Sequence, residues 1–319
     1  MTSIFREIRS AVMTAESTAG FPVTKILSIL GIARAWYYRH LDPLNTPDNR
    51  FNPYAVRDEE WLVVGYRKSH PRMGFREITY AMIDEDIAYL SESTVYRILK
   101  KHDLITEWNR IKKEHIRPEW AQEPDQKWQS DIMYLKVNGR FFYLLIFMDE
   151  YSRYIVHHAL LTTMDADSVS IQAQIAIEKL RKDSLATPII QTDNGSAFIS
   201  MEFKIVLREN SLTHKRIHPH SPTDNALIER GNRTVREEAD SRIMVNYQDA
   251  VSTIDEIVIW YNTKRRHSSL HYLTPKDYYR GDPEDLLRNR KFKLDKARSI
   301  RKEMNMMKRK GGEAAKSTS

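Results

Sequence analysis

The chain has 319 residues, of which 41% are hydrophobic and 29% are charged, and its net charge is +7. This length allows two or three domains. The absence of cysteine excludes disulfides, thiolate metal sites and a cysteine nucleophile, and fits a reducing compartment. No apolar run approaches the roughly 20 residues of a membrane span, and the N-terminus lacks the apolar core of a signal peptide. We therefore expect a cytoplasmic protein with no membrane partner.

The first 45 residues have the pattern of a helix-turn-helix segment. Val23, Ile26, Leu27 and Leu30 follow the spacing of one helix face, and Gly31 is suited to the turn that ends it. A second helical pattern covers 33–41. Its Arg34 and Arg39 are candidate DNA contacts, although any small helical hairpin would have the same outline.

Residues 55–110 are expected to form a second helical, helix-turn-helix-like domain. Helical patterns cover 59–68 and 75–83, and Ser91 is placed to cap a third helix. The outer face of that helix carries Arg97, Lys100 and Lys101, which we interpret as DNA contacts, with an ordinary solvated face as the alternative. Residues 111–124, which are charged and contain two prolines, are expected to be a linker.

Between 125 and 285 the pattern changes to a mixed α/β domain. Asn138-Gly139 predicts a tight hairpin turn between the first two strands. The later segments alternate between helical and strand patterns, which indicates a mixed sheet flanked by helices. The expected strands are 128–136, 140–149, 154–162, 188–193 and 212–217, and the expected helices are 165–183, 201–209 and 224–244.

The last segment, 286–319, concentrates the positive charge of the chain. From Arg288 on, twelve Lys and Arg residues stand against three acids. A basic tail on a near-neutral body indicates a polyanion partner, most simply nucleic acid, and the alternative is a solvated tail with no specific role. Because few apolar positions follow Leu294, we expect this tail to stay mobile until it meets phosphate.

Three acids in the α/β domain occupy positions that are typical of functional side chains. Asp131 lies within the first strand, where an unpaired carboxylate is costly unless it binds a cation or hydrogen-bond donors. Asp193 lies at the end of the fourth strand and precedes an Asn-Gly turn, and Glu229 lies on the helix that follows a Pro-containing loop. Each acid alone would more often be structural, so the prediction depends on their combination.

The combination resembles the DDE triad of the retroviral-integrase superfamily, and most closely that of the bacterial insertion-sequence transposases of the OrfB type. The chain has small departures: Gln191 stands where Ser or His is frequent, and Gly231 stands where an aromatic is common. The segments that carry the resemblance are Trp128-Gln-Ser-Asp131-Ile, Asp149-Glu-Tyr-Ser-Arg153, Gln191-Thr-Asp-Asn-Gly-Ser-Ala-Phe198, Pro222-Thr-Asp-Asn-Ala-Leu-Ile-Glu229-Arg and 261–275.

The resemblance implies an RNase H-like fold, a mixed five-stranded sheet with the acids at one edge, and an enzyme that cuts and joins DNA. Oxygen ligands without cysteine or histidine favour Mg²⁺ or Mn²⁺, and we expect two ions per active site. Asp131 would bridge both ions, while Asp193 and Glu229 would each complete one site. Asn194 and Asn225 are expected to support the loops around Asp193 and Glu229.

Arg236 lies two helical turns after Glu229 and resembles a DNA-contacting residue of related enzymes, with a surface salt bridge as the alternative. His218 and His220 could be metal ligands, but a DNA contact or a packed loop is the preferred interpretation. The expected partner is double-stranded DNA, both the terminal inverted repeats of a mobile element and its target. A homodimer or larger assembly on paired ends is expected.

Two other functions remain open from the sequence. One is a structure-specific nuclease of the RNase H-like class, which would cut without joining. The other is a DNA-binding regulator with a retired catalytic fold, which the presence of all three acids disfavours.

Overall fold

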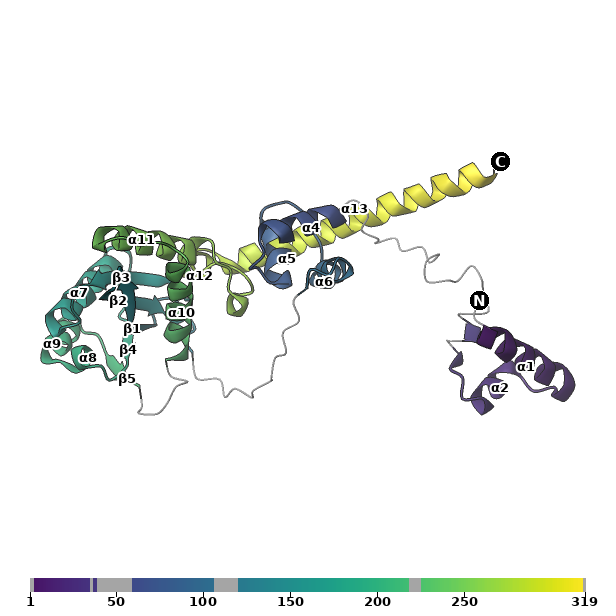
Figure 1. Cartoon of the computed structure of the whole chain (residues 1–319), viewed down its shortest axis with the longest axis horizontal. Coiled ribbons are helices and arrows are strands. Elements are labelled where there is room, and N and C mark those ends of the chain that lie inside the picture. Colours follow the sequence, from purple (N-terminus) through teal and green to yellow (C-terminus); the bar gives the residue numbers. More distant parts are fainter. Residues whose placement is uncertain (1–2, 35–36, 39–58, 106–119, 218–224, 318–319) are drawn as a thin grey trace. The chain divides into compact units, whose positions relative to one another are not determined.

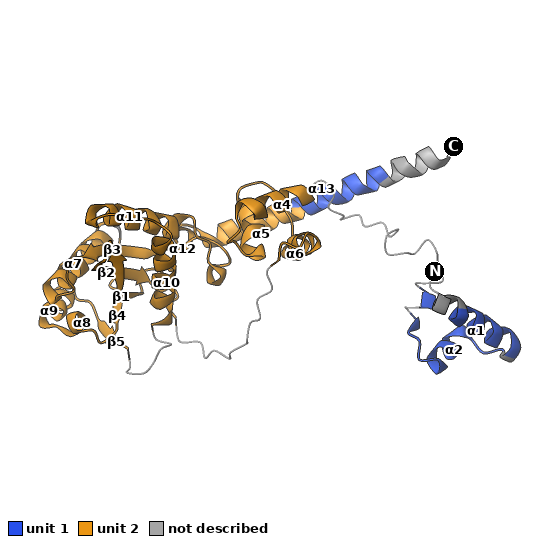
Figure 2. Ribbon diagram, viewed as in Figure 1, with its two compact units in different colours: residues 1–57, 296–319 blue, residues 58–295 orange. Residues whose placement is uncertain are grey.

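The computed structural model describes residues 3–34, 37–38, 59–105, 120–217 and 225–317. The chain divides into two compact units (Figure 2): one comprises 1–57 and 296–319, and the other comprises 58–295. Each unit is considered by itself. No helix in the described part of the chain is long and apolar enough to cross a membrane.

The N-terminal unit contains α1 (Ser3–Ala19) and α2 (Val23–Ile29), which pack around Val12, Ile26, Leu27 and Tyr37 (Figure 1). The turn after α2 is closed by Gly31 at φ 66°, and Ile32 N donates to Leu27 O at 2.9 Å. This is the bond pattern of a glycine-terminated helix. Of the predicted second helix, Arg34 is described and exposed, whereas Arg39 lies outside the described residues.

Three short helices open the larger unit: α4 (Glu60–Ser69), α5 (Phe75–Asp84) and α6 (Glu92–Lys101). We call α4–α6 the helical module. Ser91 caps α6 as predicted, because its Oγ accepts a hydrogen bond from Thr94 N. The apolar sides of these helices are buried, while the side of α6 that carries Arg97 and Lys100 is exposed.

The centre of the larger unit is a five-stranded mixed sheet in the order β3-β2-β1-β4-β5. β1, β2 and β3 pair antiparallel, and β4 and β5 extend the sheet in parallel from β1. Asn138 and Gly139 both have positive φ, as the predicted two-residue hairpin turn requires. The strands are β1 (Lys127–Val137), β2 (Arg140–Asp149), β3 (Ile155–Leu161), β4 (Ile189–Thr192) and β5 (His214–Arg216).

Helices cover both faces of this sheet and bury a separate apolar cluster on each. On one face, Trp128, Leu145 and Phe147 pack against α7, α8 and α9. On the other, Met133, Leu144 and Met148 pack against α10 and α11. The helix bounds are α7 (Ala166–Asp183), α8 (Ser196–Ile199), α9 (Met201–Glu209), α10 (Ala226–Asp240) and α11 (Tyr247–Thr263). The predicted RNase H-like α/β architecture is confirmed.

After α11 the chain forms the short helices η2 (Ser268–Leu270) and α12 (Pro275–Tyr279) and then the long helix α13 (Pro283–Ser317). The expectation of a mobile basic tail is wrong for its first part. Arg290 is 4% exposed, and its guanidinium donates four hydrogen bonds within the larger unit. The count of basic residues could not reveal that this one is buried among acceptors.

Candidate active site at the edge of the sheet

Asp131 lies on β1, on the face of the sheet that α10 covers, and its side chain is half-buried. Its two carboxylate oxygens accept separate hydrogen bonds. Ile132 N donates to Oδ1 at 2.9 Å, and Asn232 Nδ2, from α10, donates to Oδ2 at 2.8 Å. These contacts fix the orientation of the carboxylate and leave each oxygen with a lone pair.

The pKa of Asp131 is raised to about 6. Burial is the largest cause, and the negative charges of Asp193 and Glu229 raise it further, against the two hydrogen bonds that lower it. The three predicted acids are therefore close enough to interact electrostatically. A cation among them would relieve both the burial penalty and the repulsion.

Asp193 is brought beside Asp131 by the sheet topology. β4 runs parallel to β1 with Thr192 opposite Ser130, so Asp193, which follows β4, emerges next to Asp131. Its Oδ1 accepts a hydrogen bond from Gly195 N at 2.9 Å. A Cβ on Gly195 would lie 3.0 Å from that oxygen, which is closer than such contacts normally come, so the glycine leaves room for the carboxylate.

Glu229 lies in the first turn of α10 and is exposed. The helix start is held to the sheet by Gln129, whose Oε1 accepts from Ile228 N at 3.2 Å in a buried hydrogen bond. Gln129 Nε2 in turn donates to Glu150 Oε2 at 2.7 Å. Glu229 therefore stands at the same edge as the two aspartates, on a helix that is anchored two residues from Asp131.

Gln129 and Asn232 are site residues that the sequence analysis missed. A signal existed for both. Gln129 shares a strand face with Asp131 because side chains alternate along a strand, and Asn232 lies three residues after Glu229, on the same side of the helix. Many residues have the same spacing from an acid, so the spacing alone does not identify Gln129 or Asn232 as site residues.

The predicted supporting residues are placed differently from one another. Asn194 Nδ2 donates to Ile217 O at 3.2 Å and so links the Asp193 loop to the end of β5. Asn225 precedes α10 and makes no side-chain capping bond, although its carbonyl accepts from Glu229 N at 3.1 Å. Arg236 is exposed on α10, and His218 and His220 lie outside the described residues.

The packing around residue 231 explains why this chain has glycine there, where an aromatic residue is common in the family that it resembles. A Cβ at this buried position would lie 2.3 Å from Met148 Cε. The methionine side chain therefore fills the space into which a larger residue at position 231 would project. This packing does not involve the hydrogen bonds of Asp131.

The three carboxylates have the chemistry to bind a hard divalent cation, although they are not arranged as a closed ligand set. Three carboxylates with no thiolate or imidazole favour Mg²⁺ or Mn²⁺. Across the described ranges, no three His, Asp or Glu side chains are grouped tightly enough to hold an ion. The three acids share an edge and interact by charge, but they do not form a closed cage.

Asp149 is a second acid with a pKa raised to about 6, chiefly because of its complete burial. Its role is structural. Its Oδ1 accepts from Asp125 N at 2.8 Å and its Oδ2 accepts from Ser152 N at 2.8 Å, and these bonds build the corner between β2 and β3. The Asp149–Arg153 motif is therefore explained by this corner, in which Arg153 adopts a φ of 64°.

On the helical module, the predicted DNA contacts Arg97, Lys100 and Lys101 are all exposed. They differ in their partners. Lys101 Nζ lies 2.7 Å from Glu60 Oε1 and holds α6 to α4, whereas Arg97 Nε donates to the carbonyl of Ser93 within α6.

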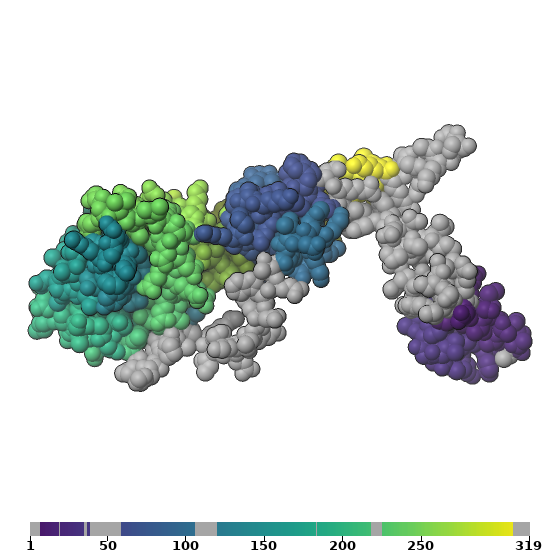
Figure 3. Space-filling model, in the orientation of Figure 1, coloured from purple at the N-terminus to yellow at the C-terminus, as the bar shows by residue number. Residues whose placement is uncertain are grey.

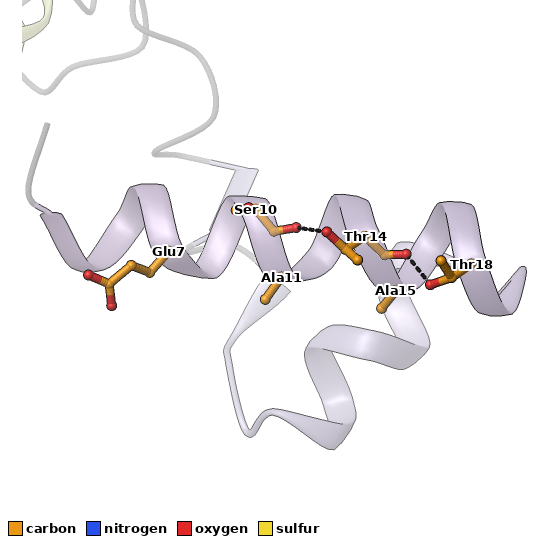
Figure 4. A pocket seen from close by; sticks show the side chains of 6 residues that line it. All are labelled: Glu7, Ser10, Ala11, Thr14, Ala15 and Thr18. Carbon is orange, nitrogen blue, oxygen red and sulfur yellow. Dashed lines mark hydrogen bonds between the residues drawn. The ribbon is translucent and has the colours of Figure 1, made fainter.

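A hollow along α1 has no comparable chemistry (Figure 4). Glu7 is the one titratable residue in its lining, and Thr14 and Thr18 use their hydroxyls for carbonyls of their own helix. The edge of the sheet is therefore the better candidate for an active site.

Comparison with known proteins shows which families the chain resembles. Two integrase core domain families match the chain, at residues 121–222 and 210–275. An Escherichia coli protein named for the transposase of insertion sequence element IS150 is 23% identical over 81% of this chain and 93% of its own length. The transposase of element IS904 from Lactococcus lactis is 28% identical over 50% of this chain and 62% of its own.

Among solved structures, the catalytic core of the HTLV-2 integrase in complex with magnesium is similar at a TM-score of 0.41 and 18% identity. This similarity covers 50% of this chain and 98% of that one.

Proposed function

Because the chain belongs to the insertion-sequence transposases that carry an integrase core domain, we propose that Asp131, Asp193 and Glu229 are its catalytic residues. They would hold divalent cations and cleave and join DNA strands at the ends of a mobile element. The observation that carries this proposal is the convergence of three acids from β1, β4 and α10 at one edge, where two of them raise the pKa of the third.

The ions would be Mg²⁺ or Mn²⁺, two per site, with Asp131 shared and Asp193 and Glu229 each completing one position. Bound there, they would neutralise the charge of the scissile phosphodiester and activate the attacking water or 3′-hydroxyl.

The chain itself contributes orientation. Ile132 N and Asn232 hold the two oxygens of Asp131, and Gly195 N holds Asp193. Gln129 keeps the first turn of α10, and therefore Glu229, against β1. These bonds reduce the rearrangement that the site must undergo when it takes up ions and DNA.

A cleavage and joining assay tests this function. The substrate is DNA that carries the ends of the element, taken from the sequence that flanks the gene, with Mg²⁺ and a target plasmid. We expect a nick at the element end followed by joined product. Cleavage without joining would indicate the structure-specific nuclease instead, and end binding without cleavage would indicate the regulator.

We also propose that the helical module binds the element end, with Arg97 and Lys100 contacting phosphates. Both lie on the exposed side of α6, beyond a helix cap that fixes the start of the helix. Arg34 and Arg39 of the N-terminal unit, and Arg236 on α10, are further candidate contacts. Two ends must be processed together, so we propose a homodimer or larger assembly on DNA, acting in the cytoplasm at the nucleoid.

Replacing Lys100 by Gln should weaken binding to end DNA and to random DNA alike, and should flatten the salt dependence by about 0.9 in slope for one lost phosphate contact. Lys101→Gln is the comparison: this neighbouring lysine is also exposed, but it is paired with Glu60, so we expect a smaller change in slope. Titrations at several salt concentrations measure both quantities. If the salt dependence of binding were unchanged in Lys100→Gln, Lys100 would not contact a DNA phosphate.

A further inference from the structure

The end of α5 is joined to the first turns of α13 by a partly buried ion pair between Asp84 and Arg290. Arg290 Nε donates to Asp84 Oδ1 and its Nη2 donates to Oδ2, both at 2.7 Å. Arg266 Nε also lies 3.3 Å from Oδ2. The side chains of Arg290 and Arg266 are only 5% and 13% exposed, so both cations are shielded from water. Paired, two-pronged contacts of this kind fix geometry as well as charge.

Two further donors of Arg290 go to the segment after α11. Nη1 donates to His271 O at 2.7 Å, and Nη2 donates to Tyr272 O at 2.8 Å. These two residues have φ values of 51° and 58°, in the left-handed region that non-glycine residues seldom adopt. The strained turn presents both carbonyls to one guanidinium, and such strain persists only where the surroundings impose it.

Aromatic contacts complete the junction. Tyr80 of α5 stacks on Tyr272 with 5.3 Å between ring centroids, and the Arg290 guanidinium lies 4.8 Å from the centre of the Tyr80 ring. In Figure 3 the blue atoms of the helical module adjoin the yellow-green atoms that precede α13. The motif at 261–275, which the proposed chemistry does not use, supplies Arg266, His271 and Tyr272 to this contact.

We propose that Asp84 and Arg290 form a latch that fixes the helical module on the catalytic core, so that an element end bound by the module is presented to Asp131, Asp193 and Glu229. This inference rests on the proposed function. Arg290, Arg266 and Asp84 are then positioning residues of the transposition reaction. A catalytic geometry that is off by about 1 Å can cost about 100-fold in rate, so a loosened module would bind DNA normally and cut it poorly.

The test compares Asp84→Asn with Asp86→Asn in the full chain. The carboxamide at 84 keeps the size but cannot accept both donors of Arg290. Asp86 is the matched control: it lies two residues on and pairs with Lys293, but 60% of its side chain is exposed. Asparagine also tolerates the positive φ of Asp86.

We expect Asp84→Asn to lower single-turnover cleavage of saturating end DNA by roughly 100-fold and to scatter the cut positions, with unchanged affinity for the end. Asp86→Asn should behave as wild type, because exposed ion pairs contribute little. Wild-type cleavage by Asp84→Asn would overturn the latch. So would a loss of end binding in proportion to cleavage, because the pair would then support the folding of the module and not its placement.

A distance measurement tests the latch independently of the proposed function. Since the chain has no cysteine, Lys68→Cys and Ile171→Cys place two spin labels, on α4 and α7. Electron–electron double resonance should give one narrow distribution for the parent protein and for Asp86→Asn, and a broad one for Asp84→Asn. A narrow distribution in Asp84→Asn would refute the latch. If the module bound no end DNA, the proposed function would fail while these distributions still decided the latch.

Discussion

Glu229→Gln should lose strand cleavage by on the order of 10³-fold or more while it keeps its fold and its affinity for end DNA. The carboxamide has the same size and the residue is exposed, so the substitution leaves no cavity and breaks no buried contact. What is lost is one negative charge at the edge where the cations would bind. Initial rates of nicking in Mg²⁺, measured at saturating DNA, give the effect.

Glu237 offers a control on the same helix. It is exposed like Glu229, and its carboxylate pairs with Arg233 at 3.1 Å, one helical turn away. Glu237→Gln removes an equal charge from α10 and should leave cleavage near the wild-type rate. Equal rates for Glu229→Gln and wild type would remove Glu229 from the catalytic set.

Asp131→Asn should stabilise the cation-free protein at neutral pH and abolish its stabilisation by Mg²⁺. Because the pKa of Asp131 is raised from 3.8 to about 6, the folded protein binds this proton more tightly than the unfolded chain does. The associated stability is therefore fully present below about pH 4 and is lost as the pH rises through about 6. Since Asp131 is only half-buried, we expect a gain of about 1–2 kcal/mol in the variant above pH 7.

Thermal unfolding between pH 4 and 8, with and without Mg²⁺, measures both effects. Relative to the variant, wild type should lose stability as the pH rises through 6 and regain it with Mg²⁺, because a ligand that binds only the folded state stabilises it. The carboxamide introduced by Asp131→Asn can still accept from Ile132 N, and the Asn232 amide can turn its unpartnered Oδ1 toward the new NH₂ group. A variant that still responded to Mg²⁺ as wild type does would show that the ion binds elsewhere.

The strands and three of the helices of the catalytic core followed closely from local pattern, whereas α8, α11 and α12 were not predicted. β2 begins and ends where its apolar run and the Asn138-Gly139 turn placed it, and α9 matches its predicted bounds. These elements are determined by periodicity and turn chemistry, which are written in neighbouring residues. That Asp131, Asp193 and Glu229 belong together was also predictable, because their spacing and surroundings resemble a known triad; their catalytic role stays a prediction.

The contacts that hold the site together were not predictable from the same information. Asn232 reaches Asp131 across 101 positions, and Arg290 reaches Asp84 across 206. In the sequence Arg290 is one basic residue among many, and nothing local distinguishes a buried, four-bonded guanidinium from its solvated neighbours. Only the packing of α13 against the end of α5 reveals the difference.

The most direct test of metal-ion catalysis at this edge is cleavage of an end substrate whose scissile 3′-oxygen is replaced by sulfur. Sulfur binds Mg²⁺ poorly and accepts the softer Mn²⁺ more readily. If ions held by Asp131, Asp193 and Glu229 act on the leaving atom, the sulfur substrate should be cut slowly in Mg²⁺ and should recover in Mn²⁺, while the oxygen substrate is cut in both. Equal cleavage of both substrates in Mg²⁺, or slow cleavage of the sulfur substrate that Mn²⁺ does not restore, would contradict the account.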